Sequence, residues 1–115
     1  MSKRVLITGV TGMVGSHLLD YLVSNTDWKI FGLCRWRSPL DNIKHHLHDI
    51  NSNGRIKLVY GDLRDTISMV NAVEETKPDI VFHLAAQSYP KTSFTAPLDT
   101  LDTNVQGTAR LLEAL

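Results

Sequence analysis

The glycine-rich stretch TGVTGMVG at residues 8–15 constrains the fold of this chain more than any other feature. Its glycines, Gly9, Gly12 and Gly15, follow a short apolar run and precede apolar residues at helical spacing. In such a loop the first glycine permits a tight turn, the second lets backbone approach a pyrophosphate, and the third lets the helix pack close to the strand. The pattern therefore predicts a strand-to-helix turn that binds a dinucleotide, with a purely structural tight turn as the alternative.

Strand and helix patterns alternate along the rest of the chain. Residues 5–8, 29–34, 56–60 and 79–84 have the pattern of buried strands. Helices are expected from about Gly12 to residues 24–26, from a cap at Asp65 to Thr76, and over residues 105–115, with a weakly helical segment at 40–50 and a loop around Pro90 and Pro97. This alternation predicts an α/β fold, a Rossmann-type doubly wound parallel sheet with strand order 3-2-1-4.

The last helical pattern reaches Leu115 without a C-cap glycine or a polar tail. We therefore expect residues 1–115 to be the N-terminal part of a dinucleotide-binding domain, truncated before the fifth strand, with a C-terminal substrate domain absent from the chain. The alternative is a natural end at Leu115, which predicts weak or no cofactor binding and aggregation through an open sheet edge.

Composition excludes several functional classes. The 12 basic and 12 acidic residues give a formal net charge of +0, so no overall field attracts nucleic acid or an anionic membrane. No apolar run approaches the roughly 20 residues of a membrane helix, and the N-terminal run is too short for a signal sequence. With a single cysteine, this pattern predicts a cytoplasmic protein.

The stretch LCRWRS at residues 33–38 occupies the position that usually sets the choice between NAD and NADP. An acid about 20 residues after the glycines accepts a hydrogen bond from the ribose 2′-hydroxyl of NAD, whereas an arginine accommodates the 2′-phosphate of NADP. Counting from Gly15 reaches Arg35, so the sequence favours NADP. Alternatively, Arg35 and Arg37 are solvated loop charges and Trp36 is a surface aromatic residue. The sequence leaves two further roles open for Trp36, stacking on adenine or covering the neighbouring helix.

The ends of the third and fourth strands supply further candidate contacts. Asp62 follows the third strand and is a candidate acceptor for the adenine amino group, or else a turn carboxylate. The small residues in LAAQS, at positions 84–88, follow the fourth strand, where the cofactor ribose and nicotinamide would pass, or else they only fill space. Ligands of such sheets bind at the carboxyl ends of the strands, so these residues are expected to lie near the glycine loop.

Four motifs, TGVTGMVGSHL, YGDL, FHLAAQS and NVQGTARLLEAL, resemble the extended short-chain dehydrogenase/reductases over the whole chain. Within that group, RWRS and AAQSYPKTSF are most similar to the GDP-mannose 4,6-dehydratase family. The resemblance implies that residues 9–14 hold the pyrophosphate, 35–38 the 2′-phosphate, 62 and 63 adenine, and 84–88 the nicotinamide side. The expected cofactor-binding residues are Gly9, Thr11, Gly12, Met13, Val14, Gly15, Arg35, Trp36, Arg37, Ser38, Asp62, Leu63, Leu84, Ala85, Ala86, Gln87 and Ser88.

The resemblance also implies an enzyme activity. It is the conversion of GDP-mannose to its 4-keto-6-deoxy product by hydride transfer from C4 to NADP, loss of water across C5 and C6, and hydride return to C6, in a homo-oligomer. Members of the wider group use a Y-x-x-x-K pair, which this chain lacks. The residues four positions after Tyr21, Tyr60 and Tyr89 are Asn25, Arg64 and Ser93. No catalytic residue is therefore expected in the chain, which alone is expected to be inactive.

The sequence departs from that family's pattern at several positions, and other functions remain open. Met13 and Val14 replace a usual Gln-Asp, Trp36 stands where a second arginine is common, and Asp99 stands where a cofactor-contacting tyrosine is usual. Asn104, in NVQGT, is more like the wider epimerase group. Related reductases and 4-epimerases are therefore alternatives, as is a non-catalytic NADP-binding sensor.

Two other features are assigned structural interpretations. His45, His46 and His48 lack the i, i+4 spacing with a converging acid or cysteine that favours a metal site, so a solvated helix and no metal are expected. Cys34 ends a predicted strand and is expected to be a small buried apolar residue.

Overall fold

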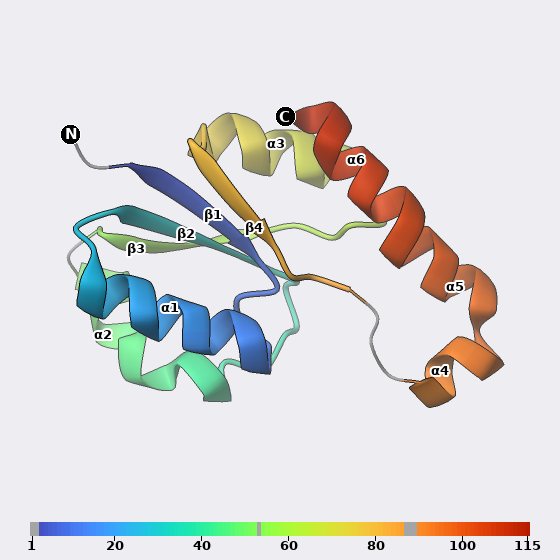
Figure 1. Ribbon diagram of the computed structural model, residues 1–115, viewed down its shortest axis with the longest axis horizontal. Helices are drawn as coiled ribbons and strands as arrows, with labels where there is room; N and C mark the ends of the chain where they lie inside the picture. The colour runs from blue at the N-terminus through green and yellow to red at the C-terminus, as the bar shows by residue number, and fades with distance from the viewer. Residues whose placement is uncertain (1–2, 53, 87–89) are drawn as a thin grey trace.

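The computed structural model describes residues 3–52, 54–86 and 90–115, which form a parallel sheet with helices on both faces (Figure 1). Its strands are β1 (Arg4–Thr8), β2 (Lys29–Cys34), β3 (Ile56–Tyr60) and β4 (Ile80–His83), in the order β3-β2-β1-β4. The predicted fold class and strand order are confirmed. Thr8 is in register with both Leu33 and His83, so the carboxyl ends of three strands lie side by side.

Helices cover the two faces of the sheet. On one face lie α1 (Met13–Asn25), a 3₁₀ turn η1 (Asp41–His46) and α2 (Leu47–Ser52), and on the other α3 (Thr66–Thr76) and α6 (Gly107–Ala114) (Figure 1). As predicted, Asp65 caps α3, because its carboxylate accepts a hydrogen bond of 3.1 Å from the Ile67 N–H. Lys77 ends α3 in the left-handed region at φ 43°, directly before Pro78.

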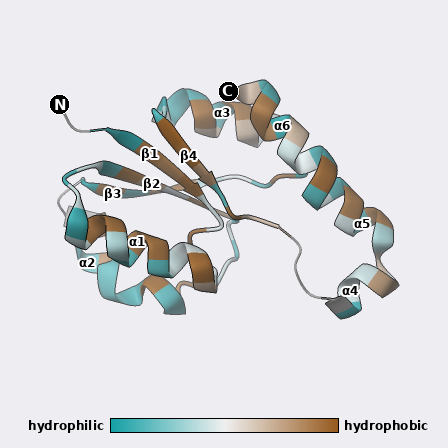
Figure 2. Ribbon diagram, in the orientation of Figure 1, coloured by the Kyte–Doolittle hydropathy of each residue, from teal (hydrophilic) through white to brown (hydrophobic). Residues whose placement is uncertain are grey.

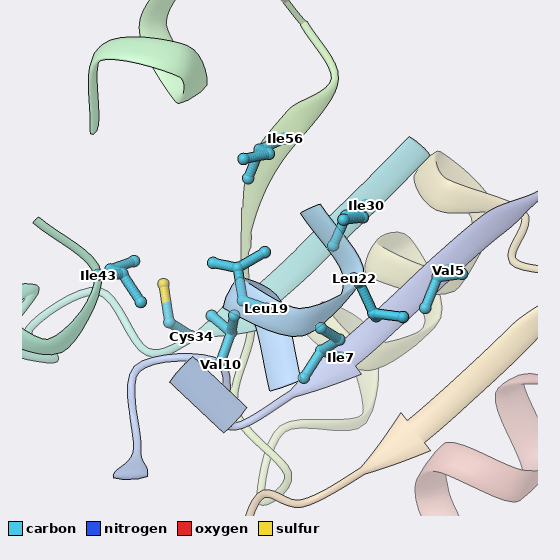
Figure 3. Packing of buried hydrophobic residues seen from close by; sticks show 9 residues of the cluster. All are labelled: Val5, Ile7, Val10, Leu19, Leu22, Ile30, Cys34, Ile43 and Ile56. Carbon is cyan, nitrogen blue, oxygen red and sulfur yellow. The ribbon is translucent and has the colours of Figure 1, made fainter. Parts of the chain in front are cut away.

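The core divides into two clusters because successive strand residues point to opposite faces. In β1, Val5 and Ile7 face α1, while Leu6 faces α3. Figure 3 shows the first cluster, in which Leu19 and Leu22 of α1 lie against strand residues. Cys34 belongs to this cluster, and burial raises the pKa of its thiol. Its predicted role as a small buried residue is confirmed.

The segment around Pro90 and Pro97 differs from the predicted loop. It forms two short helices, α4 (Pro90–Thr95) and α5 (Pro97–Leu101), followed by a π-helical turn η2 (Asp102–Gln106) that leads into α6. Pro97 is in the first turn of α5, where a backbone N–H makes no hydrogen bond within the helix. Proline lacks this N–H, so the helix loses no hydrogen bond there. Helices α4 and α5 extend beyond the sheet (Figure 1) and include hydrophobic segments (Figure 2). Among their apolar residues, Phe94 and Leu98 are 84% and 79% exposed. Within the described ranges, no helix combines the length and the apolar content needed to cross a membrane.

Candidate functional site

The carboxyl ends of the strands open into a pocket of about 520 Å³, within the size range of small-molecule sites. Loops after all four strands contribute to its wall, and α5 and η2 add two residues. The lining residues are Gly9, Thr11, Gly12, Met13, Val14, Gly15, Leu33, Cys34, Arg35, Ser38, Gly61, Asp62, Leu63, Arg64, Leu84, Ala85, Ala86, Asp99 and Thr103. The pocket thus contains most of the candidate residues that the sequence indicates.

The three loop glycines have different surroundings. Gly9 has φ +73°, and a Cβ atom there would lie 2.8 Å from the Ala85 nitrogen. A Cβ atom on Gly15 would lie 2.2 Å from the Gly9 carbonyl oxygen, whereas one on Gly12 would meet only that oxygen, at 3.4 Å. Gly9 and Gly15 are therefore required by the fold. Gly12 lines the pocket, and the fold leaves room for a side chain there. We therefore infer that glycine at this position serves to keep the pocket open.

The amino end of α1 faces the pocket with unused donors. The backbone N–H of Ser16 donates to the Gly12 carbonyl at 2.9 Å. The N–H groups of the three preceding residues have no earlier carbonyl of the helix to donate to. Gly12, the N-cap residue, has no side chain to accept from them. The helix dipole adds positive potential at the same point, so this end of α1 favours an anion.

The turn at residues 35–38 closes with a 3.1 Å hydrogen bond from the Ser38 N–H to the Arg35 carbonyl. Arg35 and Ser38 line the pocket, whereas Trp36 and Arg37 do not. Trp36 is 65% exposed and stacks on Tyr60 of β3, with ring centroids 6.0 Å apart. Among the described residues, no hydrogen bond or ion pair is made by the guanidinium group of Arg35 or of Arg37, so both groups remain available to an anion.

Asp62 lies in a charged cluster rather than at a helix cap. Its carboxylate accepts from the Arg64 backbone N–H at 2.9 Å and from the Arg64 guanidinium at 3.0 and 3.2 Å. These hydrogen bonds lower the pKa of Asp62, against the opposing effect of partial burial, and Arg35 adds a smaller attraction. Arg64 also donates to Asp99 at 3.0 Å, and the two acids raise the pKa of its guanidinium. Arg64 therefore joins the loop after β3 to α5 across the pocket wall.

The end of β4 is attached to β1 through the buried Thr8 hydroxyl. Its oxygen accepts from the N–H groups of Leu84 and Ala85 at 2.9 and 3.0 Å, and lies 2.8 Å from His83 Nδ1. With both acceptor positions of the hydroxyl in use, its proton donates to Nδ1. The backbone before Ala86 is therefore fixed to the first strand. Gln87 and Ser88 lie outside the described residues.

This arrangement also determines the tautomer of His83. Because Nδ1 accepts, the ring proton is on Nε2, which donates to the Thr108 hydroxyl at 3.0 Å, and Thr108 donates to the Asn104 carbonyl at 2.8 Å. Burial lowers the pKa of His83 below its ordinary value, which favours this neutral form. A single chain of hydrogen bonds thus runs from β1 through β4 to α6.

The lowered pKa of His83 predicts a pH-dependent stability. Below about pH 6.5, the ordinary value, the unfolded chain binds a proton at His83 that the folded chain excludes, so the free energy of unfolding should decrease as the pH falls, until the folded pKa is passed. Urea unfolding at several pH values measures this slope. In His83→Asn, whose side-chain oxygen can still accept from Thr8, the decrease should be smaller, and equal slopes in the two proteins would contradict the prediction.

Several pocket residues are absent from the predicted set. Arg64 and Asp99 are 35 positions apart in the sequence, and no local pattern indicates that they meet.

The 3₁₀ turn η1 also differs from expectation. His46 is 7% exposed, and both His45 and His46 reach Asp20 of α1, so the prediction of a solvated helix is wrong for His46. The packing of η1 on α1 places Asp20, which is distant in the sequence, beside the two histidines.

Comparisons with known proteins give consistent results. The family model of GDP-mannose 4,6 dehydratase matches residues 6–115. GDP-mannose 4,6-dehydratases of Yersinia enterocolitica and Vibrio cholerae are 38% and 40% identical over 98% and 100% of the chain. The UDP-glucose 4-epimerase of Thermus thermophilus, solved in complex with NAD, is similar over 96% of the chain with 29% identity and a TM-score of 0.80. The chain spans about a third of the length of these relatives, 31%, 32% and 33% respectively.

Proposed function

The chain belongs to the GDP-mannose 4,6-dehydratase family, and from this membership we propose that it forms the NADP-binding part of a nucleotide-sugar dehydratase that acts on GDP-mannose. The match over nearly the whole chain supports this assignment. Assembly of the complete enzyme into a homo-oligomer is part of the same proposal, as is a substrate-binding domain outside residues 1–115.

The pyrophosphate is proposed to bind at the glycine loop. The unused N–H groups at the amino end of α1 supply donors, and the absence of a side chain at Gly12 leaves room for phosphate oxygens. The exposed side chains of Met13 and Val14 flank this point, next to Thr11 on the pocket wall. The residues present therefore fit a dinucleotide at this position.

The observation that carries the NADP assignment is Arg35, a cation on the pocket wall whose guanidinium has no hydrogen bond or ion pair with any described residue and only a weaker attraction to Asp62. A guanidinium group at this position attracts a 2′-phosphate, and the Ser38 hydroxyl on the same wall offers a further hydrogen bond. Arg37 belongs to the same turn, outside the lining, and is proposed to raise the local positive potential. Trp36, stacked on Tyr60, is proposed to hold the turn in position.

The two ends of the cofactor are assigned to the loops after β3 and β4. Asp62 and Leu63 are proposed to lie at adenine, with Arg64 holding the Asp62 carboxylate in a fixed orientation. Leu84, Ala85 and Ala86 are proposed to face the nicotinamide side, where Gln87 and Ser88 stay predicted contacts. The short side chains of the two alanines leave space for a close approach by the ring.

In this proposal the chain holds the cofactor and other residues act on the sugar. The nicotinamide, when bound, supplies hydride acceptance and return. The chain's own contribution is to bind the phosphates, to fix the ring beside the end of β4, and to exclude water from one side of it. The Y-x-x-x-K pair that the family resemblance implies does not occur in this sequence.

Calorimetric titration with NADP⁺ and NAD⁺ tests the cofactor assignment. Arg35→Asp should weaken NADP⁺ binding by ~1.5–3 kcal/mol, the range of a hydrogen bond to a charged group, which is roughly a 10- to 150-fold change. Binding of NAD⁺, which has no 2′-phosphate, should be almost unaffected. Lys44→Asp makes the same change of charge at an exposed residue outside the pocket and should alter neither affinity.

The outcomes separate the possible errors. Equal affinities of the unmodified protein for NADP⁺ and NAD⁺ would mean that Arg35 does not select NADP⁺, although the pocket would still be a dinucleotide site. A parallel loss with Lys44→Asp would reassign the effect to overall charge. No binding of either cofactor would contradict the proposed function itself.

A further inference from the structure

Outside the pocket, three potential metal ligands converge between α1 and η1. The Nε2 atoms of His45 and His46 lie 2.7 and 2.6 Å from the same Oδ1 atom of Asp20. The ligand atoms of the three residues lie within 4.8 Å of one another. None of the three residues lines the pocket, so this cluster is separate from the proposed cofactor site.

Two rigid elements hold this arrangement. Asp20 is in the middle of α1, next to the core residue Leu19, and the histidines end a 3₁₀ turn whose Ile43 is fully buried. The two imidazole rings lie 4.2 Å apart between centroids and are inclined by 44°. The cluster therefore depends on the packing of η1 against α1 and not on flexible side chains alone.

Burial differs across the cluster in a way that suits a partly open site. The His46 side chain is 9% exposed, whereas those of His45 and Asp20 are 53% and 43% exposed. His46 thus anchors one side, while the other side can be reached by an ion and by water.

Two imidazole nitrogens with one carboxylate oxygen match the ligand preference of Zn²⁺ and similar ions. Zinc binds nitrogen and carboxylate oxygen at about 2.0–2.2 Å, so the three ligand atoms, which lie within 4.8 Å of one another, would have to rearrange around the ion. Both Nε2 atoms must then be deprotonated, so the ion would replace the hydrogen bonds to Asp20. We propose that Asp20, His45 and His46 bind a divalent transition metal ion such as Zn²⁺ and complete its coordination with water.

The ion would act as a structural link rather than in the dehydratase reaction. Asn42 of η1 donates a 3.0 Å hydrogen bond to the Thr11 carbonyl of the glycine loop. Fixing η1 to α1 would therefore also restrain the loop that forms one pocket wall. This inference goes beyond the proposed function and does not depend on it.

Calorimetric titration of the purified, tag-free protein with Zn²⁺ tests the proposal, together with Co²⁺ titration followed by visible absorption. The unmodified protein should bind one equivalent, and its melting temperature should rise with Zn²⁺. His45→Ala and Asp20→Asn should each weaken binding by at least about 10-fold, since even a supporting residue of a metal site typically contributes that much. His48→Ala removes an exposed imidazole two residues away and should bind as the unmodified protein does.

Asp20→Asn separates the metal site from a structural hydrogen-bonding role. An amide oxygen can still accept from both histidines, so the fold should persist by circular dichroism while Zn²⁺ binding weakens by at least about 10-fold and the rise in melting temperature with Zn²⁺ becomes smaller. Absence of Zn²⁺ binding to the unmodified protein would overturn the proposal. So would equal losses with His45→Ala and His48→Ala, or unchanged binding with Asp20→Asn and His45→Ala.

Discussion

Replacing Gly15 with alanine should lower the free energy of unfolding by about 3 kcal/mol or more, at or above the upper end for overpacking of a protein interior. The new methyl group would lie 2.2 Å from the Gly9 carbonyl oxygen and 2.9 Å from the Val10 Cα atom. Both neighbours are backbone atoms at the end of β1, so α1 must move away from the sheet to admit it. Urea unfolding followed by circular dichroism measures the loss.

Gly12→Ala is the matched control for Gly15→Ala. Gly12 has extended backbone, with φ −76° and ψ 175°, and its nearest neighbour would be 3.4 Å from the added atom. Alanine restricts the unfolded chain, which favours folding by about 0.4–1 kcal/mol, but it is a poorer N-cap than glycine, so the free energy of unfolding should change by less than about 1 kcal/mol. The methyl group would enter the pocket, so dinucleotide binding should weaken. If the two alanine variants proved equally stable, the close contact at Gly15 would not be what requires glycine there.

Replacing Thr8 with valine should destabilise the protein by about 2–4 kcal/mol, although the two side chains have the same shape. Thr8 is fully buried, and its hydroxyl is the acceptor for the Ala85 N–H and the donor to His83 Nδ1. Valine leaves both groups without that partner, and an unsatisfied buried polar group costs about 1–3 kcal/mol. The same unfolding measurement applies, and binding of the dinucleotide should weaken as well, because Ala85 lines the pocket.

The control for Thr8→Val is Thr8→Ser. Serine keeps the hydroxyl and removes one methyl group, which should cost about 1 kcal/mol. A larger loss with serine than with valine would mean that packing of the methyl group matters more than the hydrogen bonds.

Much of the fold follows from local patterns in the sequence. The glycine loop, the alternating strand and helix signals and the cap at Asp65 were sufficient for the strand order, because parallel strands joined by right-handed crossovers leave few alternatives. The helices beginning at Pro90 and Pro97 were missed. Proline is a loop signal in isolation, yet it is also well suited to the first turn of a helix, and each of these helices has six residues or fewer.

Pocket residues could be predicted from the sequence where each lies on a single loop that follows a strand. Residues near the carboxyl ends of the strands lie at a common edge, so the glycine motif at Gly12, the spacing to Arg35 and the strand end before Ala85 were enough to place these residues together. The bridge from Arg64 to Asp99 and the meeting of His46 with Asp20 join distant elements. Their partners depend on how helices pack on the sheet, which no local spacing encodes.

The hydrogen-bonded series Thr8, His83 and Thr108 restricts the substitutions that relatives of this protein can accumulate. Each side chain donates one hydrogen bond and accepts another, so changing one of them to an apolar residue leaves its neighbour without a partner. Exchanging His83 and Thr108 together for apolar residues removes the hydrogen bond between them from both sides, but it leaves the Thr8 hydroxyl proton without its acceptor at Nδ1, so the exchange should still destabilise the protein. Thr8 is restricted further, because its hydroxyl oxygen also accepts from the backbone N–H groups of Leu84 and Ala85, which every residue except proline retains. Among homologous chains we therefore expect position 83 to keep a side chain that can accept a hydrogen bond from Thr8, as histidine and asparagine can, and position 8 to keep a hydroxyl group.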